Sequence, residues 1–256
     1  MELKVRVEGK VTIRVLERGK VVKEVGAKNA VSRFFALSLA NAMRGTSASY
    51  LFYYPWKVQL FNSAGALITE LTSPSISGLQ ATWTDTSTQA YTVASVKIIG
   101  ANAYSELQNE IARATNLNVS KAADQTLQIV WSVSISGPLW QLALQIIQDC
   151  FRQGYSTKGS ANRILIRDPN GNALASIALS ADYPVSDATA SYAYCRVQGT
   201  YTPSTQQTVR YIDGAYFDGT ATTILWSYQL SSDVTLQANT TYTFRTEIQF
   251  PFDYVP

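Results

Sequence analysis

The chain has 256 residues, of which 46% are hydrophobic and 15% charged, a composition typical of one large folded domain or two smaller ones. It holds no histidine and only two cysteines, which excludes Ser–His and Cys–His nucleophile systems, most zinc sites and a disulfide framework. No apolar run reaches the roughly 18 residues of a membrane span, and no three-part secretory signal is present.

The first 26 residues alternate apolar and charged side chains, and Arg18-Gly19-Lys20 fits a turn. This pattern predicts a charged N-terminal β-hairpin, to which we assign residues 1–28. It is either an edge hairpin whose charges prevent aggregation or an arm that docks on a neighbouring subunit or faces packaged nucleic acid. Its seven basic and four acidic residues account for the whole net charge of +3, so we expect no nucleic acid contact.

Residues 29–136 predict a helix followed by strands. Val31–Arg44 has the apolar spacing of an amphipathic helix, with Asn29 as the expected N-cap and Gly45 near its end. The aromatic segment 46–56 is expected to pack over a core edge or, alternatively, to form a partner-binding patch. A hairpin and three further strands are predicted at Lys57–Leu71, Gln80–Trp83, Tyr91–Ile98 and Thr126–Ile135.

Residues 137–256 repeat this plan. Leu139–Arg152 predicts a helix with Pro138 at its first position and Gly154 near its end. Arg163–Ile177 predicts a hairpin, and longer strands follow at 191–202, 208–216, 224–230 and 241–250. The apolar tail, residues 250–256, is expected either to lie over its own domain or to pack on a neighbouring subunit.

The helices align at an offset of 108 residues, the hairpins at 106 and the closing strands at 115. Both hairpins have a glycine at the same turn position, in Asn62–Gly65 and Asp168–Gly171. Three matches in the same order predict an internal duplication. We therefore expect a mainly β protein with two tandem antiparallel β-sandwich domains of jelly-roll type. Each follows one amphipathic helix, and the N-terminal hairpin precedes both.

Few residues are candidates for catalysis, metal binding or carbohydrate binding. Asp213 and Asp218 resemble a glycosidase pair or a calcium site in spacing, although Asp and Gly more often form turns. Cys150 and Cys195 are expected to be small buried side chains, with a single disulfide left open. Four aromatic residues are candidates for a carbohydrate platform or for core packing: Tyr211, Tyr216, Phe217 and Trp226. We assign no catalytic, cofactor-binding or metal-binding residues.

Several segments together suggest a family. They are Gly9–Ile13 and Arg18–Val22 of the hairpin, the helix start Asn29–Val31, and the strands Val58–Gly65 and Thr126–Trp131. In this order they resemble virion structural proteins of tailed phages and of viruses of thermophilic archaea. The resemblance implies a jelly-roll or related β-sandwich in a capsid, vertex turret or tail.

The sequence therefore leads us to expect a non-enzymatic virion protein, made in the host cytoplasm. We expect it to multimerise through strand edges, the N-terminal hairpin and the C-terminal tail. Its expected partners are further copies and other virion proteins, with no small-molecule substrate and no cofactor. One alternative is a cell-surface filament or adhesin subunit that assembles by strand donation. A polysaccharide-acting enzyme is a third hypothesis.

Overall fold

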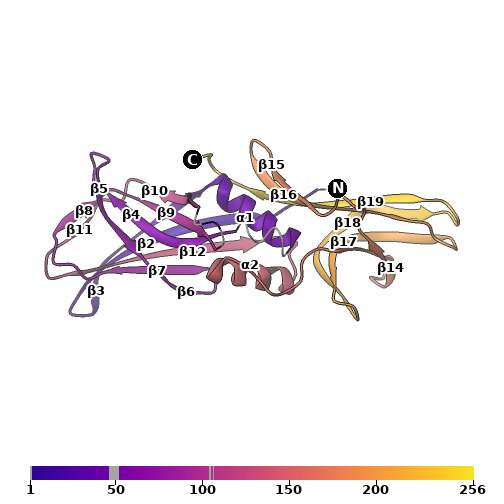
Figure 1. The fold of residues 1–256 in the computed structure, drawn as a ribbon, viewed down its shortest axis with the longest axis horizontal. Helices are drawn as coiled ribbons and strands as arrows, with labels where there is room; N and C mark the ends of the chain where they lie inside the picture. Colours follow the sequence, from indigo (N-terminus) through magenta and orange to yellow (C-terminus); the bar gives the residue numbers. More distant parts are fainter. Residues whose placement is uncertain (1, 46–51, 104, 106) are drawn as a thin grey trace.

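The structure is a computed structural model that describes residues 2–45, 52–103, 105 and 107–256. The protein is mainly β, as predicted, with large curled antiparallel sheets and two helices in the described ranges. Its body is elongated. The first half of the chain occupies one end, the second half occupies the other, and the helices lie near the middle (Figure 1).

The first half contains α1 (Arg33–Arg44) and twelve strands, named in chain order. These are β1 (Glu2–Lys4), β2 (Arg6–Glu17), β3 (Lys20–Val31), β4 (Tyr53–Phe61), β5 (Leu67–Thr72), β6 (Ser75–Ser77), β7 (Gln80–Asp85), β8 (Tyr91–Val93), β9 (Ser95–Asn102), β10 (Gln108–Ala114), β11 (Val119–Lys121) and β12 (Thr126–Ser136). The second half contains α2 (Gln141–Gln153), β13 (Arg163–Arg167), β14 (Ala173–Ala178), β15 (Val185–Ala188), β16 (Tyr192–Tyr201), β17 (Gln207–Phe217), β18 (Thr222–Leu236) and β19 (Tyr242–Pro251).

The strands form a nine-stranded sheet of order β5-β4-β9-β10-β3-β2-β12-β7-β6, two four-stranded sheets and one two-stranded sheet. The four-stranded sheets have the orders β14-β13-β17-β18 and β1-β19-β16-β15, and the small sheet pairs β11 with β8. Jelly-roll connectivity is not confirmed, because β4–β5, β13–β14 and β17–β18 pair as hairpins within one sheet.

The strand order places the N-terminal hairpin between β12 and β10 of the nine-stranded sheet, but β3 pairs with β10 only at Ala30 and Val31. β2 pairs with β12 along its length, from Leu16 opposite Thr126 to Arg6 opposite Ser136. β3 reaches β10 on the other side through Val31, which lies opposite Ala112. β2 is therefore an interior strand, whereas residues 20–29 of β3 have no strand on their outer side in the described part of the chain, so the edge interpretation holds for β3 and is wrong for β2. The boundary expected at residue 28 falls within β3.

The two predicted hairpins share one register. Lys57 pairs with Thr72 and Arg163 with Ala178, and these residue numbers differ by 106 in both strands. In each turn the glycine has a positive φ, 78° at Gly65 and 85° at Gly171. Each glycine N–H donates to the first turn residue at 3.0 Å, so the turn glycines act as predicted.

Both helices begin later than expected. The N-cap of α1 is Ser32, whose Oγ accepts from the amide of Phe35 at 3.3 Å, whereas Asn29 is buried in β3. Before α2, the amide of Trp140 donates to the carbonyl of Leu225 at 2.9 Å. This strand-like bond keeps Pro138 out of the helix. The predicted helix ends at Gly45 and Gly154 are confirmed.

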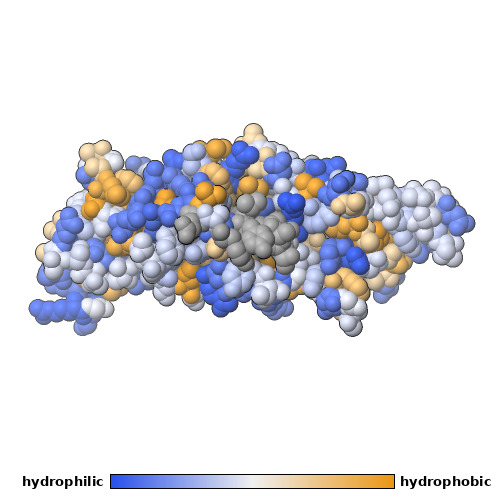
Figure 2. All heavy atoms as spheres, viewed as in Figure 1, coloured by the Kyte–Doolittle hydropathy of each residue, from blue (hydrophilic) through white to orange (hydrophobic). Residues whose placement is uncertain are grey.

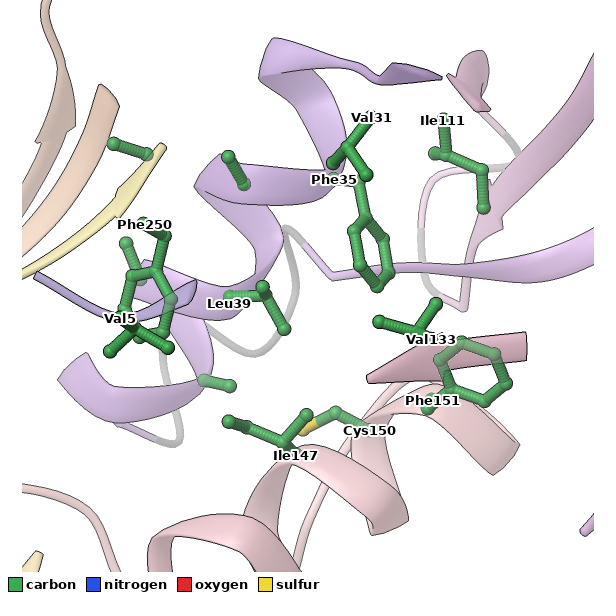
Figure 3. Packing of buried hydrophobic residues seen from close by; sticks show 14 of the residues in the cluster. Val5, Val31, Phe35, Leu39, Ile111, Val133, Ile147, Cys150, Phe151 and Phe250 are labelled. Atoms are coloured by element: carbon green, nitrogen blue, oxygen red, sulfur yellow. The ribbon is translucent and has the colours of Figure 1, made fainter. Parts of the chain in front are cut away.

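One buried core runs through both halves of the chain. Residues of α1 and α2 meet at its centre with the N-terminal Val5 and the C-terminal Phe250 (Figure 3). The ring of Phe35 lies 5.3 Å from Trp131 and 6.3 Å from Phe151. Helix α1 belongs to the first half but packs on β15, β16 and β19 of the second. The halves are therefore joined by a shared core.

The chain termini also cross between the halves. β1 pairs in parallel with β19, with Leu3 opposite Ile248. At the other terminus, the amide of Val31 donates to Asp253 Oδ2 at 2.7 Å, and the amide of Arg33 donates to the carbonyl of Tyr254 at 2.9 Å. Of the two expected placements, the tail therefore lies on its own chain. It lies, however, on the first half rather than on the half that carries it.

Candidate assembly interface

The two aspartates proposed as a carboxylate pair have separate structural roles. Asp213 is fully buried in β17 and accepts from Arg167 Nε at 2.6 Å and Nη2 at 3.2 Å. Burial raises the pKa of Asp213, and the bonds from Arg167 oppose this shift. Asp218 accepts from the amides of Thr220 and Ala221, both at 2.8 Å, which lowers its pKa. Both carboxylates are thus engaged by the chain's own donors.

The four candidate aromatic residues do not form one exposed platform. Trp226 is fully buried, and its Nε1 donates to Thr246 Oγ1 at 3.3 Å. Tyr211 lies against the Arg167 guanidinium at 4.6 Å, and Phe217 lies 5.3 Å from that of Arg163. Tyr216 packs against Gly159. These contacts favour the core-packing interpretation, most clearly for Trp226.

The two cysteines are free and buried, as expected for small core side chains. Burial raises the pKa of Cys150 to about 12, and the charge of Asp149 adds to this shift. Burial likewise raises the pKa of Cys195. Neither thiol therefore has the lowered pKa of a reactive cysteine.

A polar cluster that the sequence analysis missed ties together β7, β8 and β11. The Lys121 side chain is fully buried, and its Nζ lies 3.7 Å from Asp85 Oδ2 and donates to the carbonyl of Gln89 at 3.0 Å. Tyr91 donates its hydroxyl to Asp85. Burial acts to raise the pKa of Asp85, but hydrogen bonds from Tyr91 and Ser87 outweigh it and the pKa is lowered. Lys121, Asp85 and Tyr91 thus find hydrogen-bond or ionic partners within the cluster, which indicates a structural role.

Within the described ranges, no group of three or more Asp, Glu or Cys residues lies close enough to hold a metal ion. In the same ranges, no helix is both long and apolar enough to span a membrane. The remaining candidates for a functional site are surfaces where strands end or lack a neighbouring strand.

The first such surface is the tip of the β2–β3 hairpin, residues 17–24, at one end of the body (Figure 1). Its hydrophilic outer part stands out in Figure 2. Val21 and Val22 are nonetheless 51% and 52% exposed, next to Lys20 and Lys23. This mixture of exposed valines and charged residues is a candidate contact.

The aromatic segment 46–56 divides between two regions. Residues 46–51 lie outside the described residues. Phe52 is fully buried and Tyr53 is 8% exposed, and Phe52 lies 6.3 Å from the ring of Phe35. These two residues pack into the core, as the first interpretation expected.

The second surface is the outer edge of β19, at the opposite end of the body (Figure 1). β19 pairs with β16 over ten residues without a register shift. On its other side, β1 covers only Glu247–Gln249. In the described part of the chain, Tyr242–Thr246 therefore has no strand on that side.

These features define an elongated, mainly β protein with interlocked halves and an exposed strand element at each end. No known protein family, no curated protein and no solved structure matches the chain.

Proposed function

We propose that the chain is a non-enzymatic virion structural protein that self-assembles into a capsid, vertex or turret, or tail component. Its partners are further copies and other virion proteins, and its location is the virion. The supporting observation is the pair of exposed strand elements, the hairpin tip and the β19 edge, at opposite ends of one body. The sequence resemblance supports the virion setting, and the geometry supports assembly.

We also propose that the chain arose by tandem duplication of a helix-plus-β-sandwich unit. In the first unit, Ile98 pairs with Val58 on one side and with Ala112 on the other. At the equivalent positions of the second unit, Gly214 pairs with Ile164 on one side and with Trp226 on the other. A register shift follows at the same place in both, after Ile98 and after Gly214. Shared bulge position and shared pairing support a common origin.

The proposed units differ at one sheet border. In the first unit, the β2–β3 hairpin fills the space between β12 and β10. In the second unit, the corresponding strands β19 and β18 have no such hairpin between them. The large Trp226 stands where the first unit has Ala112, and its fully buried ring lies against Gly214.

Light scattering of the purified protein, followed by negative-stain imaging, tests self-assembly. We expect a mass well above 28.1 kDa and regular particles. Replacing both Val21 and Val22 with Glu should reduce the assembled mass. The matched control is Leu67→Glu, which alters an equally exposed residue of β5. A monomer at every concentration would contradict the proposal. Deleting residues 1–26 is unsuitable, because it removes β2 from the sheet interior.

The second candidate function is a cell-surface filament or adhesin subunit that assembles by strand donation. The three-residue pairing of β1 on β19 favours it, because most of that edge is left for another strand. Imaging separates the two functions. Filaments favour the second candidate, and rings or closed shells favour the first.

A further inference from the structure

We infer that the open edge of β19, Tyr242–Thr246, is a binding site for an extended peptide strand with alternating apolar residues, supplied by another protein chain. The inference rests on the proposed duplication. The inference does not require self-assembly of the protein.

The backbone of this edge is ready to pair. The amide of Val5 donates to the carbonyl of Gln249 at 2.9 Å, which shows that the backbone groups of Gln249 point away from β16. Because these directions alternate along an antiparallel strand, Arg245 and Thr243 point the same way. Both side chains are exposed, and no described strand pairs with this side of the two residues. An added strand would therefore gain backbone hydrogen bonds without breaking existing ones.

The first unit shows which kind of strand pairs with the equivalent edge. With the offset of 115 between β12 and β19, Tyr242–Thr246 corresponds to Leu127–Trp131. Those residues pair with Val11–Val15 of β2. Val11 and Ile13 are fully buried and Val15 is 2% exposed, while Arg14 lies on the outer face. The equivalent strand for β19 thus has apolar residues at alternate positions.

Two other edges of the molecule carry protective features that this one lacks. The free side of β3 carries Lys20, Lys23 and Lys28. β18 is fifteen residues long, but its register shifts opposite Val209 and Tyr211, which bends the edge. Lysines and bulges are the usual means by which proteins prevent edge pairing. The segment Tyr242–Thr246 has one charged residue, no proline and no register shift.

An exposed apolar side chain lies on β18 of the other four-stranded sheet, near the start of β19. The amide of Gln237, just after β18, donates to the hydroxyl of Tyr242 at 2.8 Å, which places the end of β18 beside the start of β19. Val234, three residues earlier in the chain, is 43% exposed. An incoming strand would cover Val234 with its apolar face. This cover would favour a strand whose apolar residues alternate over a fully polar one.

The test uses the intact protein and a fluorescent peptide with the sequence of residues 9–17, Gly-Lys-Val-Thr-Ile-Arg-Val-Leu-Glu, followed by fluorescence anisotropy. We expect saturable binding. Thr243→Pro should weaken it at least tenfold, because it removes an N–H that faces the open side. The matched control Thr243→Ala keeps that N–H and should bind like the wild type.

A second probe leaves the protein unaltered and so does not depend on the folding of the proline variant. The same peptide, N-methylated at alternate residues on its pairing side, should lose binding, and a scrambled peptide without alternation should not bind. Absence of saturable binding would overturn the inference, as would equal binding by Thr243→Pro or by the scrambled peptide. A protein that stays monomeric yet binds the peptide contradicts the proposed self-assembly alone.

Discussion

Replacing Gly214 with alanine tests how tightly the ring of Trp226 packs against the backbone of β17. A Cβ at this position would lie 2.1 Å from Cε2 and 2.2 Å from Cζ2 of Trp226. Ordinary carbon contacts are about 3.5–4.0 Å, so the indole ring must move by more than an ångström. Trp226 is fully buried, and because protein interiors are close-packed, such a shift must displace its neighbours.

The expected loss has two parts. Overpacking a core costs about 1–3 kcal/mol, and losing the bond from Trp226 Nε1 to Thr246 adds about 1 kcal/mol. We therefore expect Gly214→Ala to lower the free energy of unfolding by about 2–4 kcal/mol. For a chain of this size, that corresponds to a drop in Tm of about 5–15 °C. Urea unfolding followed by tryptophan fluorescence, and a thermal scan by circular dichroism, measure it.

The first unit supplies the matched control. Its equivalent pair is Ile98 and Ala112, with the large side chain on the other strand. Gly214→Ile alone should be severely destabilised, and adding Trp226→Ala should restore part of the loss. The double-mutant cycle should therefore show a coupling of about 1–3 kcal/mol. Wild-type stability for Gly214→Ala, or additive effects in the cycle, would refute the proposed role of Trp226.

Three further predictions concern buried groups. Arg167→Met leaves the carboxylate of Asp213 buried without its cation, so urea unfolding should show a loss of about 3–5 kcal/mol, and adding Asp213→Asn should recover much of it. Cys150 and Cys195 should not react with a thiol reagent in the native protein, whereas both should react in urea. The folded-state pKa of Asp85 lies below its ordinary 3.8, so its stabilising effect is present above that pH and is lost as the pH falls through the folded value. The stability of Asp85→Asn should accordingly fall less than that of the wild type in acid titrations followed by circular dichroism.

Local signals in the sequence were sufficient for the turns and helix ends. Asp168-Pro169-Asn170-Gly171 specifies its turn through the conformational preferences of those residues alone. Gly154 ends its helix for the same kind of reason, with φ at 81°. Such features depend on neighbours a few residues away, which the sequence displays directly.

Contacts between residues distant in sequence could not be predicted from such local signals. The alternation of Val11, Ile13 and Val15 indicates one buried face, but it does not say which strands lie on either side. The start of α1 also depends on a partner distant in sequence, because Val31 bonds to Asp253 before Ser32 caps the helix. The carboxylate candidate Asp213 was misleading, since only the fold shows that Arg167 covers it.

The crossing of the two termini has a consequence for synthesis. The amides of Val31 and Arg33 donate to acceptors in residues 253–254, and Asp253 is synthesised 222 residues after Val31. β1 likewise has its strand partner in β19, at the other end of the described chain. The first half therefore leaves the ribosome before the partners of its helix start and of β1 have been made. Contacts this distant in sequence slow folding, so the first half remains incompletely folded until residues 247–254 are available.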